Sequence, residues 1–132
     1  MAEGDFAQQL LEAARRDLTA WRKLAPDVEI HDSTLGFHAQ QAVEKSIKAV
    51  LAHAKVAFRR SHDIAELLDV LGDAGLAAPP HAMELDRLNP FAIEARYGYP
   101  LAGPLDRDTV GGRIEAVVVW AGRVVGTGGL PG

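Results

Sequence analysis

The chain has 132 residues, 48% of them hydrophobic, and no cysteine. It is long enough to bury a core as one domain, and disulfides, thiolate metal sites and a cysteine nucleophile are excluded. The formal net charge of −4 argues against non-specific attraction to a nucleic-acid backbone. No apolar run approaches the ~20 residues of a membrane span, and the charged N-terminus lacks the apolar segment of a signal peptide. We therefore expect a soluble, cytoplasmic protein.

The first half of the chain predicts two long helices separated by a polar loop. Apolar residues recur at helical spacing after Asp5, which is a plausible cap, and Pro26 ends this helix. A second helix is expected over residues 34–56, with Ser33 or Thr34 available as its cap. The two helices would pack antiparallel, because the loop between them is short.

The second helix is strongly amphipathic. Its aliphatic face comprises Leu35, Ala39, Ala42, Val43, Ile47, Val50 and Ala54, and its polar face comprises Gln41, Glu44, Lys45, Lys48 and Lys55. We expect the aliphatic face to lie in the core and the polar face to meet water or a partner. Phe37 falls on the polar face, where an aromatic ring needs cover. The surface formed by Phe37, Gln41, Glu44 and Lys48 is therefore a candidate for self-association or for docking of a partner.

The middle of the chain predicts shorter helices. Asp63 and Glu66 form a capping pair before an apolar stripe, so a third helix should begin there and be closed by Gly72 or Gly75. A fourth helix follows a pair of prolines. Pro90 lies inside its pattern and must kink the helix or split it in two.

The end of the chain is ambiguous by local propensity. Residues 96–106 are rich in turn formers and predict a loop. Residues 113–125 contain a valine run that favours a strand, but no other segment could pair with it, so we expect a helix. The predicted fold class is all-α, an up-and-down antiparallel bundle of four to five helices over residues 1–125. A flexible glycine-rich tail would occupy residues 126–132.

Three separated motifs carry a resemblance to a known family. A helix bearing AQQAVEKSIKAVL is followed by SHDIAELL and then by a helix ending in ARYGYP. This order and spacing resemble the HEPN family, named as a nucleotide-binding domain of higher eukaryotes and prokaryotes, over about residues 5–125. The matching positions are Gln41, Glu44, Lys45, Lys48, His62, Asp63, Arg96, Tyr97 and Pro100.

The resemblance implies a homodimer, often encoded beside a minimal nucleotidyltransferase in a toxin–antitoxin arrangement. Many members are regarded as metal-independent ribonucleases, marked by an arginine followed after a short interval by a histidine. This chain departs from that signature, because the residues after Arg96 are YGYPLAG and include no histidine. The favoured hypothesis is therefore a dimeric helical partner of a minimal nucleotidyltransferase. A metal-independent endoribonuclease with an atypical site is the alternative.

Cleavage of RNA without a metal requires a base, an acid and a cation that stabilises the charge on the phosphate. His62 is the candidate base or acid, and Arg60 or Arg96 would hold the phosphate across a dimer cleft. His62 has an alternative role, which is to help Asp63 cap the third helix.

Nucleotide binding is a further hypothesis. The stretch from Lys45 to His62 carries five basic residues and no acid, and it could hold a phosphate or meet an acidic partner. Phosphate would be bound by Lys45, Lys48 or Arg60, and the base would stack on Phe37, Tyr97 or Tyr99. The sequence contains no glycine-rich phosphate loop.

The two tyrosines have two further interpretations. The resemblance implies that Tyr97 and Tyr99 could accept nucleotidyl groups from the partner enzyme. The alternative is that both rings pack against the end of the bundle. The histidines lack the spacing of a zinc site, so we expect no metal and no cofactor other than a nucleotide ligand.

Overall fold

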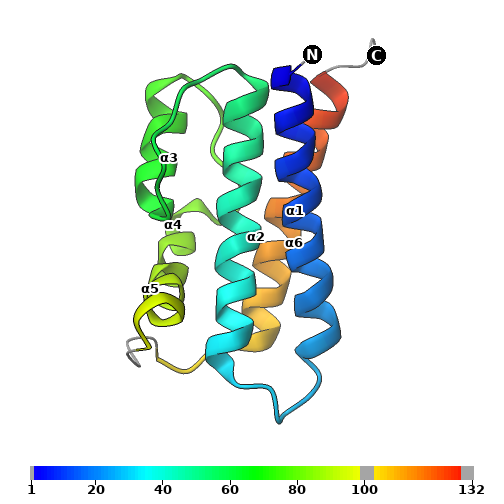
Figure 1. The fold of residues 1–132 in the computed structure, drawn as a ribbon, viewed down its shortest axis with the longest axis vertical. Coiled ribbons are helices and arrows are strands. Elements are labelled where there is room, and N and C mark those ends of the chain that lie inside the picture. The colour runs from blue at the N-terminus through cyan, green and yellow to red at the C-terminus, as the bar shows by residue number, and fades with distance from the viewer. Residues whose placement is uncertain (1, 99–102, 129–132) are drawn as a thin grey trace.

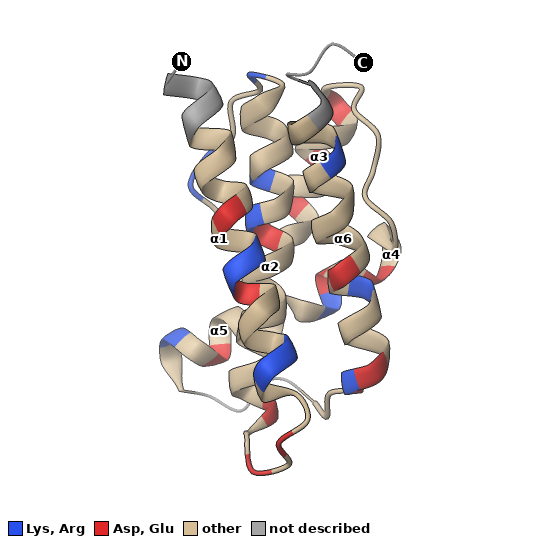
Figure 2. Ribbon diagram, turned by 90° about the vertical axis from the view of Figure 1, so that its right-hand side faces the viewer, with Lys and Arg blue, Asp and Glu red and all other residues tan. Residues whose placement is uncertain are grey.

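Three long helices lie side by side and a column of short helices covers one side of them (Figures 1 and 2). The computed structural model describes residues 2–98 and 103–128. The long helices are α1 (Ala2–Leu24), α2 (Asp32–His53) and α6 (Arg107–Gly128). The column consists of α3 (Ile64–Asp73), α4 (Ala82–Leu85), the 3-10 turn η1 (Asp86–Leu88) and α5 (Asn89–Tyr97). The described residues contain no strand, so the predicted all-α bundle is confirmed.

Helix α2 lies at the centre of the molecule and contacts α1, α6, α5 and α3. Its predicted aliphatic face is buried from Leu35 to Val50, while Ala54 lies beyond the helix and is exposed. The core is made of large aliphatic side chains from α1, α2, α3, α4 and α6, among them Leu11, Leu35, Ile47, Leu51, Ile64, Leu67, Leu71, Leu85, Ile114 and Val117. Because neighbours surround α2 on most sides, little of its surface remains for solvent.

Helix α1 ends at Leu24, just before Pro26 as predicted, whereas the start of α1 and both ends of α2 differ from the prediction. Asp5 is not the cap of α1, because it lies within the helix. The cap of α2 is His31, whose Nδ1 accepts a hydrogen bond from the backbone N–H of Ser33 at 3.1 Å. Helix α2 stops at His53 rather than at residue 56, because Lys55 adopts a left-handed conformation with φ of 61°. Such a residue closes a helix and redirects the chain.

Residues 54–63 form a strap that runs back along α2, so that α3 begins beside the middle of that helix (Figure 1). Asp63 caps α3 as predicted, since its Oδ1 accepts from the backbone N–H of Ala65 at 2.9 Å. The predicted closure falls at Gly75, whose φ is 74°. The N–H of Leu76 then bonds the carbonyl of Leu71, which completes the helix end. The strap is thus fixed at one end by a capped helix.

The predicted split at Pro90 and the predicted helix near the C-terminus are both confirmed. Pro90 lies in the first turn of α5, where its missing N–H costs nothing. Helix α6 is longer than residues 113–125, and it includes residues 126–128 of the predicted tail. Residues 129–132 lie outside the described part of the chain. None of the helices in the described residues is long and apolar enough to cross a membrane.

Arg107 anchors the start of α6 to the loop between α1 and α2. Its guanidinium donates to the carbonyls of Ala25, Asp27 and Ile30 at 2.7, 3.0 and 2.6 Å, and to the carboxylate of Asp32. Asp106 caps the same helix end by accepting from the backbone N–H and the hydroxyl of Thr109, and these bonds lower the pKa of Asp106. The loop after α1 and the starts of α2 and α6 are therefore held together.

Candidate ligand groove and a buried carboxylate network

The polar face of α2 is largely covered, and the expectation that it meets water or a partner is wrong for Glu44 and Lys48. Glu44 is only 3% exposed, and Lys48 is also buried. The strap causes this burial, because its residues Phe58 and His62 lie against Lys48 and Glu44. Glu44 is therefore unavailable as part of a docking surface.

The buried carboxylate of Glu44 is the centre of a hydrogen-bond network. Its Oε1 lies 3.0 Å from the donors Gln40 Nε2 and His62 Nδ1, and its Oε2 accepts from Lys48 Nζ at 2.9 Å. Gln40 Nε2 also donates to the backbone carbonyl of His62 at 3.0 Å, and Gln41 donates to Gln40 Oε1 at 2.7 Å. The network joins α2 to the strap immediately before α3 begins.

The electrostatics of this network favour an ionised Glu44. Burial raises the pKa of Glu44, but hydrogen bonds from Gln40, Lys48 and His62 and the charge of Lys48 outweigh it. The pKa of Glu44 is therefore lowered below its usual value. A negatively charged Glu44 fixes the Lys48 ammonium in place. Glu44 also accepts a hydrogen bond from Nδ1 of His62, so the other nitrogen of the ring points away from the carboxylate. The side chain of His62 is 39% exposed.

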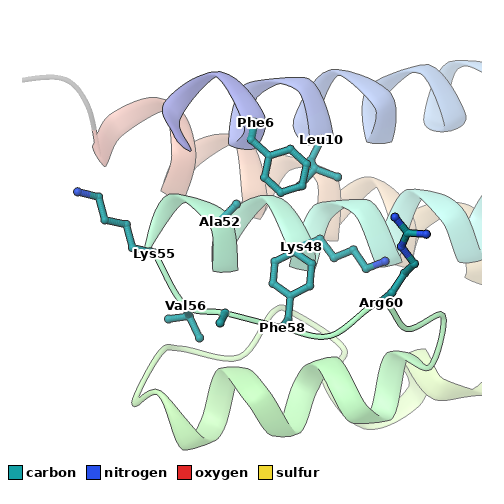
Figure 3. Close-up of a pocket in the computed structure, with 9 residues that line it drawn as sticks. Phe6, Leu10, Lys48, Ala52, Lys55, Val56, Phe58 and Arg60 are labelled. Atoms are coloured by element: carbon teal, nitrogen blue, oxygen red, sulfur yellow. The ribbon is translucent and has the colours of Figure 1, made fainter. Parts of the chain in front are cut away.

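A groove of about 570 Å³ opens beside this network, between α1, the end of α2 and the strap (Figure 3). It is lined by Phe6, Leu10, Lys48, Ala52, Lys55, Val56, Ala57, Phe58 and Arg60. Figure 3 shows Phe6 and Phe58 on opposite walls, with the nitrogen atoms of Lys48 and Arg60 gathered at one end. The Lys48 ammonium lies 6.0 Å from the centre of the Phe58 ring, within range of a cation–π contact. The groove thus combines two aromatic rings with cations.

Two of the predicted phosphate ligands, Lys48 and Arg60, lie together in this groove. Lys45 is not in its lining. Its Nζ binds Asp17 Oδ2 at 2.8 Å, and His38 Nδ1 lies 3.0 Å from the other oxygen of that carboxylate. Lys45 therefore ties α2 to α1 through Asp17.

The predicted aromatic and arginine partners lie elsewhere. Arg96 and Tyr97 are exposed in the last turn of α5, at the far end of the helix from Asn89, which contacts Asp63 beside His62. Phe37 is half-buried and lines a small hollow between α2 and α5. Tyr99 falls outside the described residues. The structure thus separates Arg96, Tyr97 and Phe37 from the basic groove.

Sequence reasoning missed the apolar walls of the groove. Phe6 lies at helical spacing from the core residues of α1, yet it is 47% exposed and lines the groove. Phe58 lies between basic residues, and that single aromatic ring was the available signal for a ligand site. Gln40 was also missed, although its spacing of four residues from Glu44 permits a side-chain bond on a helix.

The family assignment rests on the matched extent of the chain. The HEPN domain family model matches residues 7–120, which includes α2, the strap and most of α6. The chain belongs to the HEPN domain family. No curated protein and no solved structure matches it. In this HEPN domain, the family-like positions Glu44, His62 and Asp63 hold the strap on α2 and begin α3. No group of His, Asp and Glu side chains within residues 2–98 and 103–128 could hold a metal ion.

Proposed function

We propose that this HEPN domain binds a nucleotide, or a similar ligand that joins a planar ring to a phosphate, in the groove of α1, α2 and the strap. The observation that supports this proposal is the pairing of two facing phenylalanines with the cations of Lys48 and Arg60 in one groove (Figure 3). Its volume of about 570 Å³ lies within the range of small-ligand pockets.

The two halves of such a ligand would meet different parts of the groove. The base would lie between Phe6 and Phe58, where stacking contributes about 1–3 kcal/mol per base and tolerates any base. The phosphate would be bound by the exposed guanidinium of Arg60, whose paired N–H groups match phosphate oxygens. Lys48 already binds Glu44, so it would contribute less than Arg60.

Titration calorimetry with AMP, ATP, adenosine and inorganic pyrophosphate tests this function. We expect the nucleotides to bind more tightly than adenosine or pyrophosphate alone, because each of those fills half of the groove. Arg60→Ala should weaken nucleotide binding about tenfold, the loss typical of one hydrogen bond to a charged group. Phe58→Ala should weaken the binding of nucleotides and adenosine but leave the affinity for pyrophosphate unchanged.

The neighbouring arginine provides the matched control. Arg59 is also exposed and basic, but it lies outside the groove and forms a two-bond ion pair with Glu66 at 2.7 and 2.6 Å. Arg59→Ala removes the same charge and should leave the affinity unchanged. Equal losses in Arg59→Ala and Arg60→Ala, or no heat with any nucleotide at millimolar concentration, would refute the proposal.

We infer further that the protein is the homodimeric partner of a minimal nucleotidyltransferase in a toxin–antitoxin-like module, as the family resemblance implies. Of the predicted partner surface, Phe37 and Gln41 retain exposure and support this role. Tyr97, at 67% exposure, is accessible to a nucleotidyl-transferring partner. Phe37→Asp should convert a dimer to a monomer in sedimentation. An unchanged mass would count against this surface.

The alternative of a metal-independent endoribonuclease is supported by His62, because its ring is partly exposed, held by Glu44 and close in sequence to Arg60. A carboxylate on one ring nitrogen orients the other for proton transfer. Incubation of the protein with structured RNA tests this activity. Cleavage lost in both His62→Ala and Arg60→Ala would support it, whereas cleavage that survives these changes and Arg96→Ala would exclude these residues.

A further inference from the structure

A second groove lies between α1 and α6, the two long helices labelled on either side of α2 in Figure 2. It has a volume of about 680 Å³ and is lined by Arg15, Leu18, Thr19, Arg22, Val118, Val119, Gly122, Arg123 and Gly126. None of these residues lines the groove beside Phe58. This groove is therefore a separate surface from the one proposed to bind a nucleotide.

The floor of this α1–α6 groove is apolar and its rim is basic. Leu18 and Val118 form part of the floor, and Val119 is 44% exposed beside it. Gly126 leaves open space, because a Cβ placed there would meet no atom within 4 Å. A strip of this kind offers an elongated partner apolar contact along its centre.

The arginines of the rim are positioned to meet carboxylates. A Cβ at Gly122 would lie 2.9 Å from Nη2 of Arg15, so the glycine lets the guanidinium lie across α6. Arg22 binds Glu115 Oε1 at 2.9 Å, and both side chains are about half exposed. An exposed ion pair of this kind contributes little stability, so a carboxylate from a partner could replace Glu115 at low cost.

We propose that the α1–α6 groove docks an acidic amphipathic helix of a partner protein. Arg15 and Arg22 are seven residues apart on α1, which is about 10 Å along the helix axis. A partner helix that lies along the groove can place one carboxylate at Arg15 and one at Arg22 if its two acidic residues are also seven residues apart. Its apolar residues between them, one turn from each acid, contact Leu18 and Val119. The apolar floor favours a protein segment over a nucleic-acid backbone, which offers only phosphates and sugars.

The probe for this proposal is a synthetic helical peptide with Glu at two positions seven residues apart and Leu one turn inward from each. Fluorescence anisotropy with the full chain should show saturable binding that weakens as salt is raised. Arg15→Glu should weaken the binding of the peptide at least tenfold, because the substitution replaces attraction with repulsion between the rim and the acidic peptide. Arg16→Glu is the matched control, since Arg16 is the exposed neighbour of Arg15 on α1 but does not line the groove. It should leave the affinity within about twofold.

A second pair of variants tests the floor without changing charge. Gly126→Leu fills the open space of the groove and should abolish peptide binding, whereas Gly112→Leu adds the same side chain to α6 outside the groove and should not. Equal affinities in Arg15→Glu and Arg16→Glu, or no binding of the peptide at millimolar concentration, would overturn the proposal. Binding of single-stranded RNA that depends on Arg15 would also overturn it. Self-association of the chain that is lost in Gly126→Leu would overturn it as well. The occupant would be a nucleic acid in the first case and a second copy of the chain in the second.

Discussion

Replacement of Glu44 by glutamine should destabilise the protein strongly while leaving its shape intact. Glutamine keeps the size of glutamate and one acceptor oxygen, but it carries no charge. The Lys48 ammonium, which Glu44 Oε2 binds at 2.9 Å, would then remain buried beside an amide. The link from Gln40 and Glu44 to the strap at His62 would weaken at the same time.

The size of the effect follows from the burial of the pair. Removal of one partner from a buried, hydrogen-bonded ion pair costs about 3–5 kcal/mol, because the other charge is left without compensation. Lys48 retains some access to water, with 11% of its side chain exposed, so we expect about 3 kcal/mol. In a chain of this length that corresponds to a fall in Tm of roughly 10 °C.

Thermal unfolding followed by circular dichroism as a function of pH measures this effect. The pKa of Glu44 is lowered in the folded protein, so its contribution to stability is complete above the unfolded pKa near 4.5. The contribution is lost as the pH falls through the lower, folded pKa. The difference in Tm between the wild type and Glu44→Gln should be present at pH 7 and should shrink below about pH 4.5.

Two further variants separate the buried charge from other causes. Glu66→Gln breaks the exposed ion pair with Arg59 and should lower Tm far less than Glu44→Gln does. The double variant Glu44→Leu/Lys48→Met removes both buried charges and should be more stable than Glu44→Gln, because no charge remains unpaired. If Glu44→Gln has the Tm of the wild type, or if its deficit persists unchanged at pH 3, our account of the network is refuted.

Two other positions carry predictions for stability. Gly36→Ala should cost about 2 kcal/mol or more in a denaturant titration, because a Cβ at that position would overlap the Phe91 ring that packs α5 on α2; an unchanged midpoint would show that this contact adjusts freely. Arg107→Lys should cost about 2 kcal/mol in the same assay, since an ammonium cannot reach all three loop carbonyls and Asp32 at once; full stability in this variant would mean that the α1–α2 loop does not depend on the guanidinium.

The amino-acid sequence by itself determined the helices and several of their ends. The apolar spacing of α2 and α3, the cap at Asp63 and the break at Pro90 are local features, because a helix depends on residues within one or two turns of each other. The order of three motifs also identified the HEPN family before any fold was known. Helix α6 shows the limit of this approach, since its valine run favours a strand and only the lack of a pairing segment predicts the helix.

Only the tertiary structure decided which surfaces remain accessible. The pattern of α2 separates polar from apolar positions, but the strap after it folds back and buries Glu44 and Lys48. The groove between α1, α2 and the strap likewise depends on Phe6 and Phe58, which are far apart in the chain and line opposite walls of it. Helical periodicity in the sequence distinguishes the polar face of a single helix from its apolar face. The burial of a face depends on which distant segment packs against it, and local spacing carries no information about that segment.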